Sequence, residues 1–274
     1  MRIAYRLISA QSRSSRVALV ALAVAAASLG GCVELGGSPG GPSAAAAQTP
    51  PTGGDQWRAY TDEWGKRYDQ SPGDKTASIN YARGLRALTR YNEAAAVMRS
   101  AAVEAPQDFE VLGEYGKALA DSGQLAQAKD VLTRAYSDDR PDWTIMSVQG
   151  AVEDELGDHD GARRFYVEAL KIAPGEPFLL NNLGLSYALT KQLPQAEATL
   201  REASASPHAD VRVRNNLALV LSLEGKYAQA EDVSRQDMSD DAARANVKAI
   251  RQMLASRGVA SALRSSPQSA VSTD

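Results

Sequence analysis

Residues 177–210 read PFLLNNLGLSYALTKQLPQAEATLREASASPHAD, and this stretch of 34 residues is one period of a pattern that runs through most of the chain. Its Ala196 belongs to a series of five alanines, each 34 residues from the next without insertion or deletion: Ala94, Ala128, Ala162, Ala196 and Ala230. A fixed period of this length indicates tandem copies of one supersecondary unit.

Other phases of the period repeat as well. When each unit is numbered so that its alanine is position 20, position 8 is always small: Ala82, Gly116, Gly150, Gly184 and Ala218. If each unit is a pair of helices joined by a turn, a proline follows the second helix in four successive units. A glycine stands at the turn between the two helices in three units. These are Pro106, Pro141, Pro174 and Pro207, and Gly123, Gly157 and Gly225. Small residues at positions 8 and 20 let two antiparallel helices approach closely, and bulky residues at positions 17 and 24 fill the space between neighbouring hairpins.

This pattern resembles the tetratricopeptide repeat (TPR), a helix–turn–helix unit. The resemblance implies an all-α fold, a right-handed solenoid of about five helix–turn–helix repeats with a leading half-repeat helix and a C-terminal capping helix. The leading helix carries an aromatic stripe that either packs on the first hairpin or receives a partner: Trp57, Tyr60, Trp64 and Tyr68. Ser239 or Asp240 can cap the last helix, which carries Val247, Ile250 and Leu254 on one face.

The N-terminus resembles a bacterial lipoprotein signal. Four arginines precede an apolar run over residues 17–29, and Leu29-Gly30-Gly31-Cys32 resembles a lipobox. The resemblance implies cleavage before Cys32, acylation of its thiol and amine, and sorting to the periplasmic face of the bacterial outer membrane. The alternative is a leaderless protein with a hydrophobic N-terminus. We therefore divide the chain into a signal peptide (1–31), a lipidated cysteine with a flexible tether (32–54), the TPR solenoid with its capping helices (55–255) and a disordered tail (256–274).

Charge and cysteine content narrow the class of partner. Removal of residues 1–31, which contain four arginines and no acidic residue, changes the formal charge from −3 to −7. A nucleic-acid binder needs a basic face, so we expect no nucleic-acid partner. Cys32 is the only cysteine, so the exported chain has no intramolecular disulfide.

Catalysis has little support in the sequence. The chain has two histidines and no H-E-x-x-H run that would hold zinc. The segment Asp158-His159-Asp160-Gly161 lacks the further ligands of a calcium loop. No stretch outside the repeats is long enough for a hydrolase domain. We therefore expect no enzyme activity, no cofactor and no metal.

Function is expected in the groove lined by the first helix of each unit. Its candidate residues carry amide, guanidinium and leucine side chains: Asn80, Arg83, Asn182, Leu185, Asn216 and Leu219. Spaced amides can hydrogen-bond the backbone of an extended peptide while leucines accept apolar side chains. The alternative is that these asparagines favour the helix start and the leucines are packing residues. TPR relatives that clamp a terminal carboxylate carry Lys at position 5 and Asn at position 9, where this chain has Ile79 and Arg83.

The lipobox, the tether, the repeats and the segments Asn215–Val220 and Asn246–Arg251 together resemble the TadD family, TPR lipoproteins of the tight-adherence (Flp) pilus assembly machinery. That resemblance implies a pilotin-like scaffold that binds a segment of the pilus secretin or another assembly subunit and contacts the membrane through its lipid anchor. The alternative is a periplasmic TPR adaptor for outer-membrane protein assembly or for cell-wall-remodelling enzymes.

Overall fold

The computed structural model describes residue 51 and residues 53–256, which form twelve helices and contain no β-strand. α2 (Gly54–Gln70) precedes five antiparallel hairpins, and α13 (Asp240–Ser256) follows them. The hairpins are α3 (Lys75–Ala87) with α4 (Tyr91–Glu104), α5 (Phe109–Ser122) with α6 (Leu125–Leu132), α7 (Trp143–Leu156) with α8 (His159–Ile172), α9 (Pro177–Leu189) with α10 (Leu193–Ala205), and α11 (Val211–Leu223) with α12 (Tyr227–Ser234). The predicted all-α TPR solenoid is confirmed.

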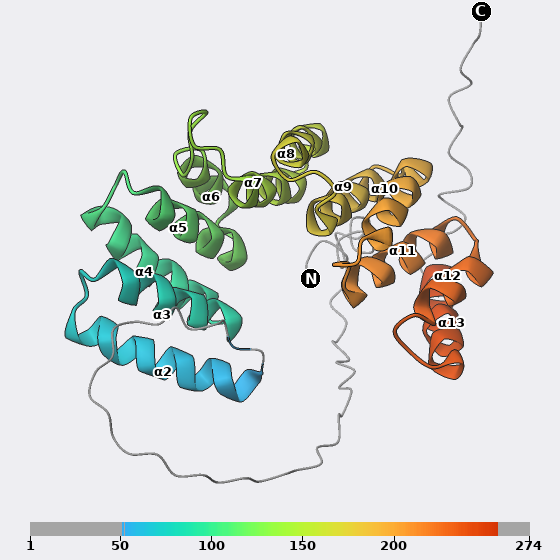
Figure 1. The fold of residues 1–274 in the computed structure, drawn as a ribbon, viewed down its shortest axis with the longest axis horizontal. Helices are drawn as coiled ribbons and strands as arrows, with labels where there is room; N and C mark the ends of the chain where they lie inside the picture. Colours follow the sequence, from blue (N-terminus) through green and yellow to red (C-terminus); the bar gives the residue numbers. More distant parts are fainter. Residues whose placement is uncertain (1–50, 52, 257–274) are drawn as a thin grey trace, which may run out of the picture.

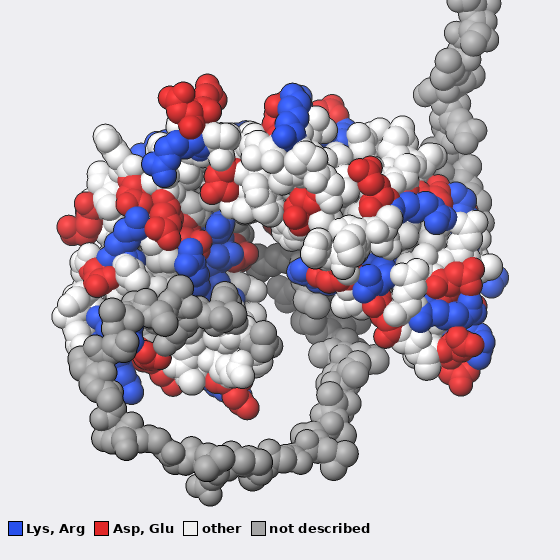
Figure 2. Space-filling model, in the orientation of Figure 1, with Lys and Arg blue, Asp and Glu red and all other residues white. Residues whose placement is uncertain are grey.

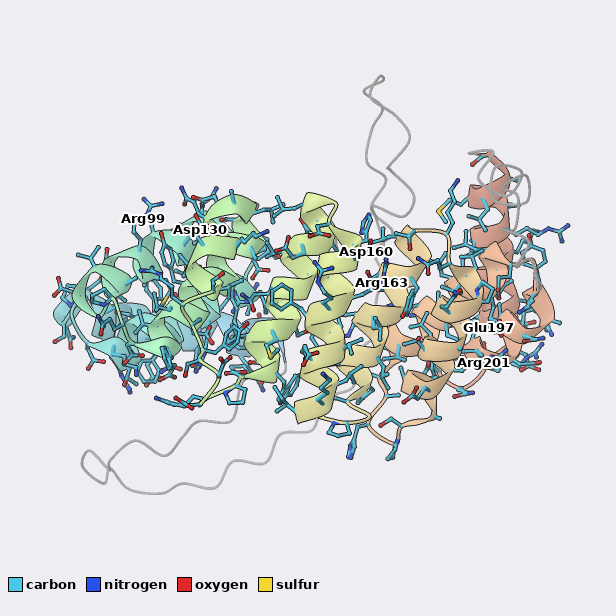
Figure 3. All side chains as sticks on the ribbon, turned by 90° about the horizontal axis from the view of Figure 1, so that it is seen from above. Arg99, Asp130, Asp160, Arg163, Glu197 and Arg201 are labelled. Carbon is cyan, nitrogen blue, oxygen red and sulfur yellow. The ribbon has the colours of Figure 1, made fainter. Side chains whose placement is uncertain are left out.

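The hairpins follow one another around an arc, with α2 at one end and α13 at the other (Figure 1). The first helix of each hairpin faces the inside of the arc, and the second helix lies outside. Figure 3 looks onto the outer side, where second helices present charged side chains such as Arg99, Asp130, Arg163 and Glu197. The inner side is therefore built from α3, α5, α7, α9 and α11.

An acidic residue caps the start of every inner helix. Asp74, Asp108, Asp142, Glu176 and Asp210 stand 34 residues apart, and each side chain accepts a hydrogen bond from one or two backbone N–H groups of the helix that follows. A carboxylate at this position pairs an otherwise unbonded N–H and favours the positive end of the helix dipole. The period thus fixes where each inner helix begins.

The glycines at position 8 allow the close approach of the two helices in the second, third and fourth hairpins. A Cβ on Gly150 would lie 2.5 Å from Cε1 of Tyr166, and one on Gly184 would lie 2.7 Å from Cγ of Leu200. Gly116 faces Leu132 in the same way. The structure therefore places the bulky position-24 side chain over position 8 of its own hairpin, whereas we expected it chiefly between hairpins.

The turn inside each hairpin requires a left-handed residue. Gly123, Gly157 and Gly225 have φ of 83°, 94° and 82° at position 15 of their units. The equivalent residues of the first and fourth units are Thr89 and Lys191, with φ of 61° and 63°. A side chain with a Cβ is strained in this region, and a β-branched one more so.

The second unit departs from the pattern. Its outer helix α6 has 8 residues, as has α12 of the fifth unit, whereas α4 and α8 have 14. After α6 the chain forms a turn in which Ser137 pairs with Arg140. Asp138 and Asp139 would lie at the negative end of a longer α6, where acidic residues are unfavourable. Residues 133–142 instead form a loop at the edge of the arc (Figure 1).

Both ends of the solenoid are covered. On α2, Trp64 is buried and the ring of Tyr68 lies 5.6 Å from that of Tyr81 on α3, so this part of the aromatic stripe packs on the first hairpin. On α13, Val247 is buried in the apolar cluster of the last hairpin, and Leu254 is also buried. In the part of the chain that the structure describes, no helix has the length and apolar character needed to span a bilayer. The predicted signal peptide, Cys32 and the predicted tail beyond Ser256 lie outside the described residues.

Candidate functional site

Three adjoining pockets line the inner side of the arc. The N-terminal pocket, about 470 Å³, is lined by Trp57, Tyr60, Asn80, Arg83, Arg86, Ala87, Tyr91 and Asp121. The central pocket, about 240 Å³, is lined by Arg86, Lys117, Ala120, Asp121, Leu125, Ser147, Val148, Ala151, Val152, Glu155, Phe178 and Asn182. The C-terminal pocket, about 420 Å³, is lined by Glu176, Pro177, Phe178, Asn181, Asn182, Leu185, His208, Asp210, Arg212, Val213, Asn215 and Asn216. Neighbouring pockets share residues, so together they form one groove.

The α3–α5 end of the groove is strongly charged. Arg83, Arg86 and Lys117 lie 3.0, 3.3 and 3.2 Å from the carboxylate of Glu114, which is only 5% exposed. Burial alone would raise the pKa of Glu114, but the three cations outweigh it and hold the pKa below its usual range. Arg86 also pairs with Asp121 at 2.7 Å. Basic side chains border the hollow of the arc on this side (Figure 2).

The α7–α11 end carries amides that bond to one another. Asn216 Nδ2 donates to Asn181 Oδ1 at 2.8 Å, Asn181 Nδ2 donates to Asn182 Oδ1 at 3.3 Å, and Asn182 Nδ2 donates to Ser147 Oγ at 3.3 Å. This chain of four side chains links three inner helices. Each amide has a second N–H or a second lone pair left over, which can serve a ligand.

Five of the six predicted groove residues line these pockets. Asn80 and Arg83 line the N-terminal pocket, where Asn80 Oδ1 accepts a hydrogen bond of 2.6 Å from Tyr60. Asn182, Leu185 and Asn216 line the C-terminal pocket, although Leu185 itself is buried. Leu219 is buried in α11 and lines none of the three pockets.

The six candidates leave out other residues of the groove, among them four at positions 2 and 5 of their units. Asn181 and Ser147 join the amide chain from position 5 of their units, Asn215 lines the C-terminal pocket from the same position, and Phe178 stands between two pockets. Ser147, Asn181 and Asn215 occupy the same position of three successive units, so this polar series can be read from the sequence. Phe178 is 44% exposed, which only the structure reveals.

A buried carboxylate lies just behind the groove. Asp154 Oδ1 accepts hydrogen bonds of 2.8 Å from both Ser186 Oγ and His159 Nδ1, and Tyr166 donates to Oδ2 at 3.2 Å. Burial raises the pKa of Asp154, and its bonds to His159 and Ser186 oppose that rise. Serine and histidine both bond the same carboxylate oxygen, so the imidazole is not positioned to activate this fully buried hydroxyl. The cluster joins α7, α8 and α9.

No metal cluster is found among residues 51 and 53–256, where no three His, Cys, Asp or Glu side chains are grouped to hold an ion. His159 of the segment tested for calcium is bound to Asp154, and Asp158 caps α8 by accepting from the N–H of Gly161. These side chains are used within the fold.

Comparison with known proteins supports the repeat architecture. A tetratricopeptide-repeat family model matches residues 211–236, the segment that contains α11 and α12. No curated protein matches the chain.

Solved structures share the fold at low sequence identity. PilW, described as a widely conserved type IV pilus biogenesis factor, superposes with a TM-score of 0.60 and 16% identity, covering 68% of this chain and 90% of PilW. Human IFIT1, solved with m7Gppp-AAAA, gives a TM-score of 0.57 and 17% identity over 67% of this chain. This chain spans 46% of the IFIT1 chain, about half its length. The repeat match and these folds identify the five hairpins as tetratricopeptide repeats in structure.

Proposed function

We propose that this chain is a lipid-anchored periplasmic scaffold that holds an extended segment of a partner protein in its concave groove during assembly of a tight-adherence (Flp) pilus. The observation that carries the proposal is the continuity of three pockets along the inner helices. A groove of this kind suits an extended polypeptide, which offers side chains to successive pockets and backbone groups to the amides between them.

The hydrogen-bonding chemistry of the groove supports a polypeptide guest. The bonds among Asn181, Asn182 and Asn216 fix the amide planes, so the remaining donors and acceptors point in set directions. Val148, Val152 and Phe178 supply apolar walls to the central pocket, which Asn182 also lines. Fixed amides beside apolar walls match the alternation of backbone and side chain in an extended strand.

The membrane and pilus parts of the proposal rest on other features. The lipobox resemblance at Cys32 supports a lipid anchor, and the TadD-family resemblance supports a place in pilus assembly beside the secretin. PilW, a pilus biogenesis factor, has a solenoid of similar arrangement. Acyl chains on one cysteine add about 0.8 kcal/mol per buried methylene, so more than one chain anchors firmly.

The decisive experiment measures secretin multimers in the outer membrane of a deletion strain. We expect them to be lost on deletion and restored by the wild-type gene. The double variant Asn182→Ala/Asn216→Ala should fail to restore them, whereas Asp130→Asn, on the outer side of the arc, should succeed. Normal multimers in the deletion strain would reject the pilus role.

The anchor is tested separately. An alkyne-tagged palmitate should label the wild-type protein and not the Cys32→Ser variant, and only the labelled form should fractionate with the outer membrane. If the protein is labelled but co-purifies with barrel-assembly or wall-remodelling proteins instead of a secretin, the adaptor function replaces the pilotin function.

A further inference from the structure

We propose that the groove selects for charge order along its guest: an extended polypeptide with acidic residues at the α3–α5 end, two apolar side chains on either side of Phe178, and basic residues at the α9–α11 end. This inference rests on the proposed function in taking a polypeptide as the guest. The inference adds to that function the order of charged and apolar residues that a polypeptide needs in order to bind.

The α3–α5 end favours an anion at Lys117. Arg83, Arg86 and Lys117 all surround one buried carboxylate, that of Glu114, at 3.0 to 3.3 Å. Arg83 and Arg86 have further counter-ions, Glu110 at 3.7 Å and Asp121 at 2.7 Å, whereas the one carboxylate paired with Lys117 in the described ranges is that of Glu114. Lys117 Nζ shares Glu114 Oε1 with the guanidinium of Arg83, so neither has that oxygen to itself. Lys117 lines the central pocket, where a carboxylate of the guest can reach its ammonium group.

The opposite end favours cations. Glu176 and Asp210 line the C-terminal pocket, and their side chains also cap α9 and α11. Asp210 pairs with Arg212 at 2.6 Å, but no lysine or arginine in the described ranges lies within 4.0 Å of the Glu176 carboxylate. Two carboxylates and one guanidinium thus border this pocket. A lysine or arginine of the guest therefore finds an anion here.

Phe178 sets the apolar part of the guest. Its side chain is 44% exposed and belongs to the walls of both the central and the C-terminal pockets. Val148 and Val152 line the first pocket, and Leu185 and Val213 line the second. An extended strand places alternate side chains on one face, so residues i and i+2 can enter the two pockets on either side of the ring.

The test uses purified full-length protein in detergent and four blocked nonapeptides that share a Leu-Ser-Leu centre. One carries Asp-Glu before the centre and Lys-Arg after it, the second has this order reversed, the third mixes one acid and one base at each end, and the fourth is uncharged. Fluorescence polarisation at low salt measures each affinity. We expect the better of the two ordered peptides to bind about threefold to tenfold tighter than the mixed one, as exposed or half-exposed ion pairs allow.

Matched variants assign the preference to the groove. Lys117→Gln with Glu176→Asn removes both charges while leaving a hydrogen-bonding side chain for Glu114 and an N-cap for α9. This variant should lose the preference and keep its affinity for the uncharged peptide. Lys171→Gln, on the outer helix α8, should keep the preference. Phe178→Ala should lower the affinity of the protein for all four peptides by the same factor.

The outcomes separate the two proposals. Equal affinity for ordered and mixed peptides overturns the charge order while leaving the polypeptide groove intact. A preference that survives the Lys117→Gln/Glu176→Asn change also overturns it. If none of the four peptides binds at millimolar concentration, both the charge order and the polypeptide groove are wrong.

Discussion

Asn216 on α11 donates its amide hydrogen to Asn181 on α9 across 35 residues, one more than the repeat period. Asn182 and Ser147 are joined over the same separation. A position-6 amide thus bonds position 5 of the preceding unit at two successive junctions. The amides that we expected to be open to a ligand therefore also hold neighbouring repeats in register.

Asn216→Ala should lower stability as well as partner capture. It leaves Asn181 Oδ1, on a residue that is 8% exposed, without its donor. We expect a loss of about 0.5–1.5 kcal/mol in the free energy of unfolding, measured by urea denaturation. Asn215→Ala, an exposed neighbour, is the control and should change stability by less than about 0.5 kcal/mol. Equal effects of the two changes would contradict a structural role for the bond.

Ala128→Leu should destabilise the second hairpin. Ala128 is fully buried where α6 meets its neighbours, so three more carbon atoms overpack the site at a cost of roughly 1–3 kcal/mol. Ala126→Leu on the exposed face of the same helix should cost less than about 0.5 kcal/mol. Thermal unfolding followed by circular dichroism distinguishes the two variants. A wild-type midpoint for Ala128→Leu would show that the space around Ala128 accommodates a leucine.

Thr89→Gly and Lys191→Gly should stabilise the protein. Both residues hold the left-handed conformation that glycine supplies in the other three hairpins. Relief of roughly 1–2 kcal/mol of backbone strain exceeds the added entropy of a glycine in the unfolded chain, about 0.5–1 kcal/mol. Thr89 is β-branched and should show the larger gain in urea midpoint. A lower midpoint in both variants would mean that the side chains contribute more than the strain costs.

Glu197→Gln should change the acid sensitivity of the fourth hairpin. Burial alone would raise the pKa of Glu197, but hydrogen bonds from Lys226 and Arg201 outweigh it and lower the pKa from 4.5 to about 2. A carboxylate with a depressed pKa stabilises the fold above pH 4.5, and that stabilisation is lost as the pH falls toward 2. The variant should therefore be less stable than wild type at pH 7, with the difference shrinking below pH 4.5.

The matched control for that prediction is Glu202→Gln, an exposed residue of the same helix. It should track the wild-type protein at every pH in urea titrations. A Glu197→Gln variant whose deficit is constant from pH 7 to pH 2 would show that the deficit does not come from ionisation. Figure 3 shows Glu197 and Arg201 together on α10.

The sequence predicted the elements of the fold better than their lengths. An unbroken period of 34 places Ala94 and its four equivalents at the same point of every hairpin, so the number and order of helices followed directly. The early end of α6 did not follow, because it depends on the local sequence Ser137-Asp138-Asp139 and not on the period. Cys32 and its lipidation lie outside the described residues and stay a prediction.

The groove was predictable in place but not in detail. Inner-face positions were known from the period, and Asn182 and Asn216 do line a pocket. Leu185 lines the same pocket but is only 4% exposed, so its side chain offers little surface to a guest. The shared carboxylate of Glu114 requires side chains from two units to meet, which a single-unit pattern cannot reveal.

The acidic caps at Asp74, Asp108, Asp142, Glu176 and Asp210 have a genetic consequence. Because each cap is the last residue before the helix that it serves, recombination between any two equivalent points joins a capping acid to a complete inner helix. Loss or duplication of one unit therefore creates no inner helix whose N-terminus lacks a capping side chain. The length of the scaffold can change in whole steps of 34 residues while every inner helix keeps an acidic N-cap.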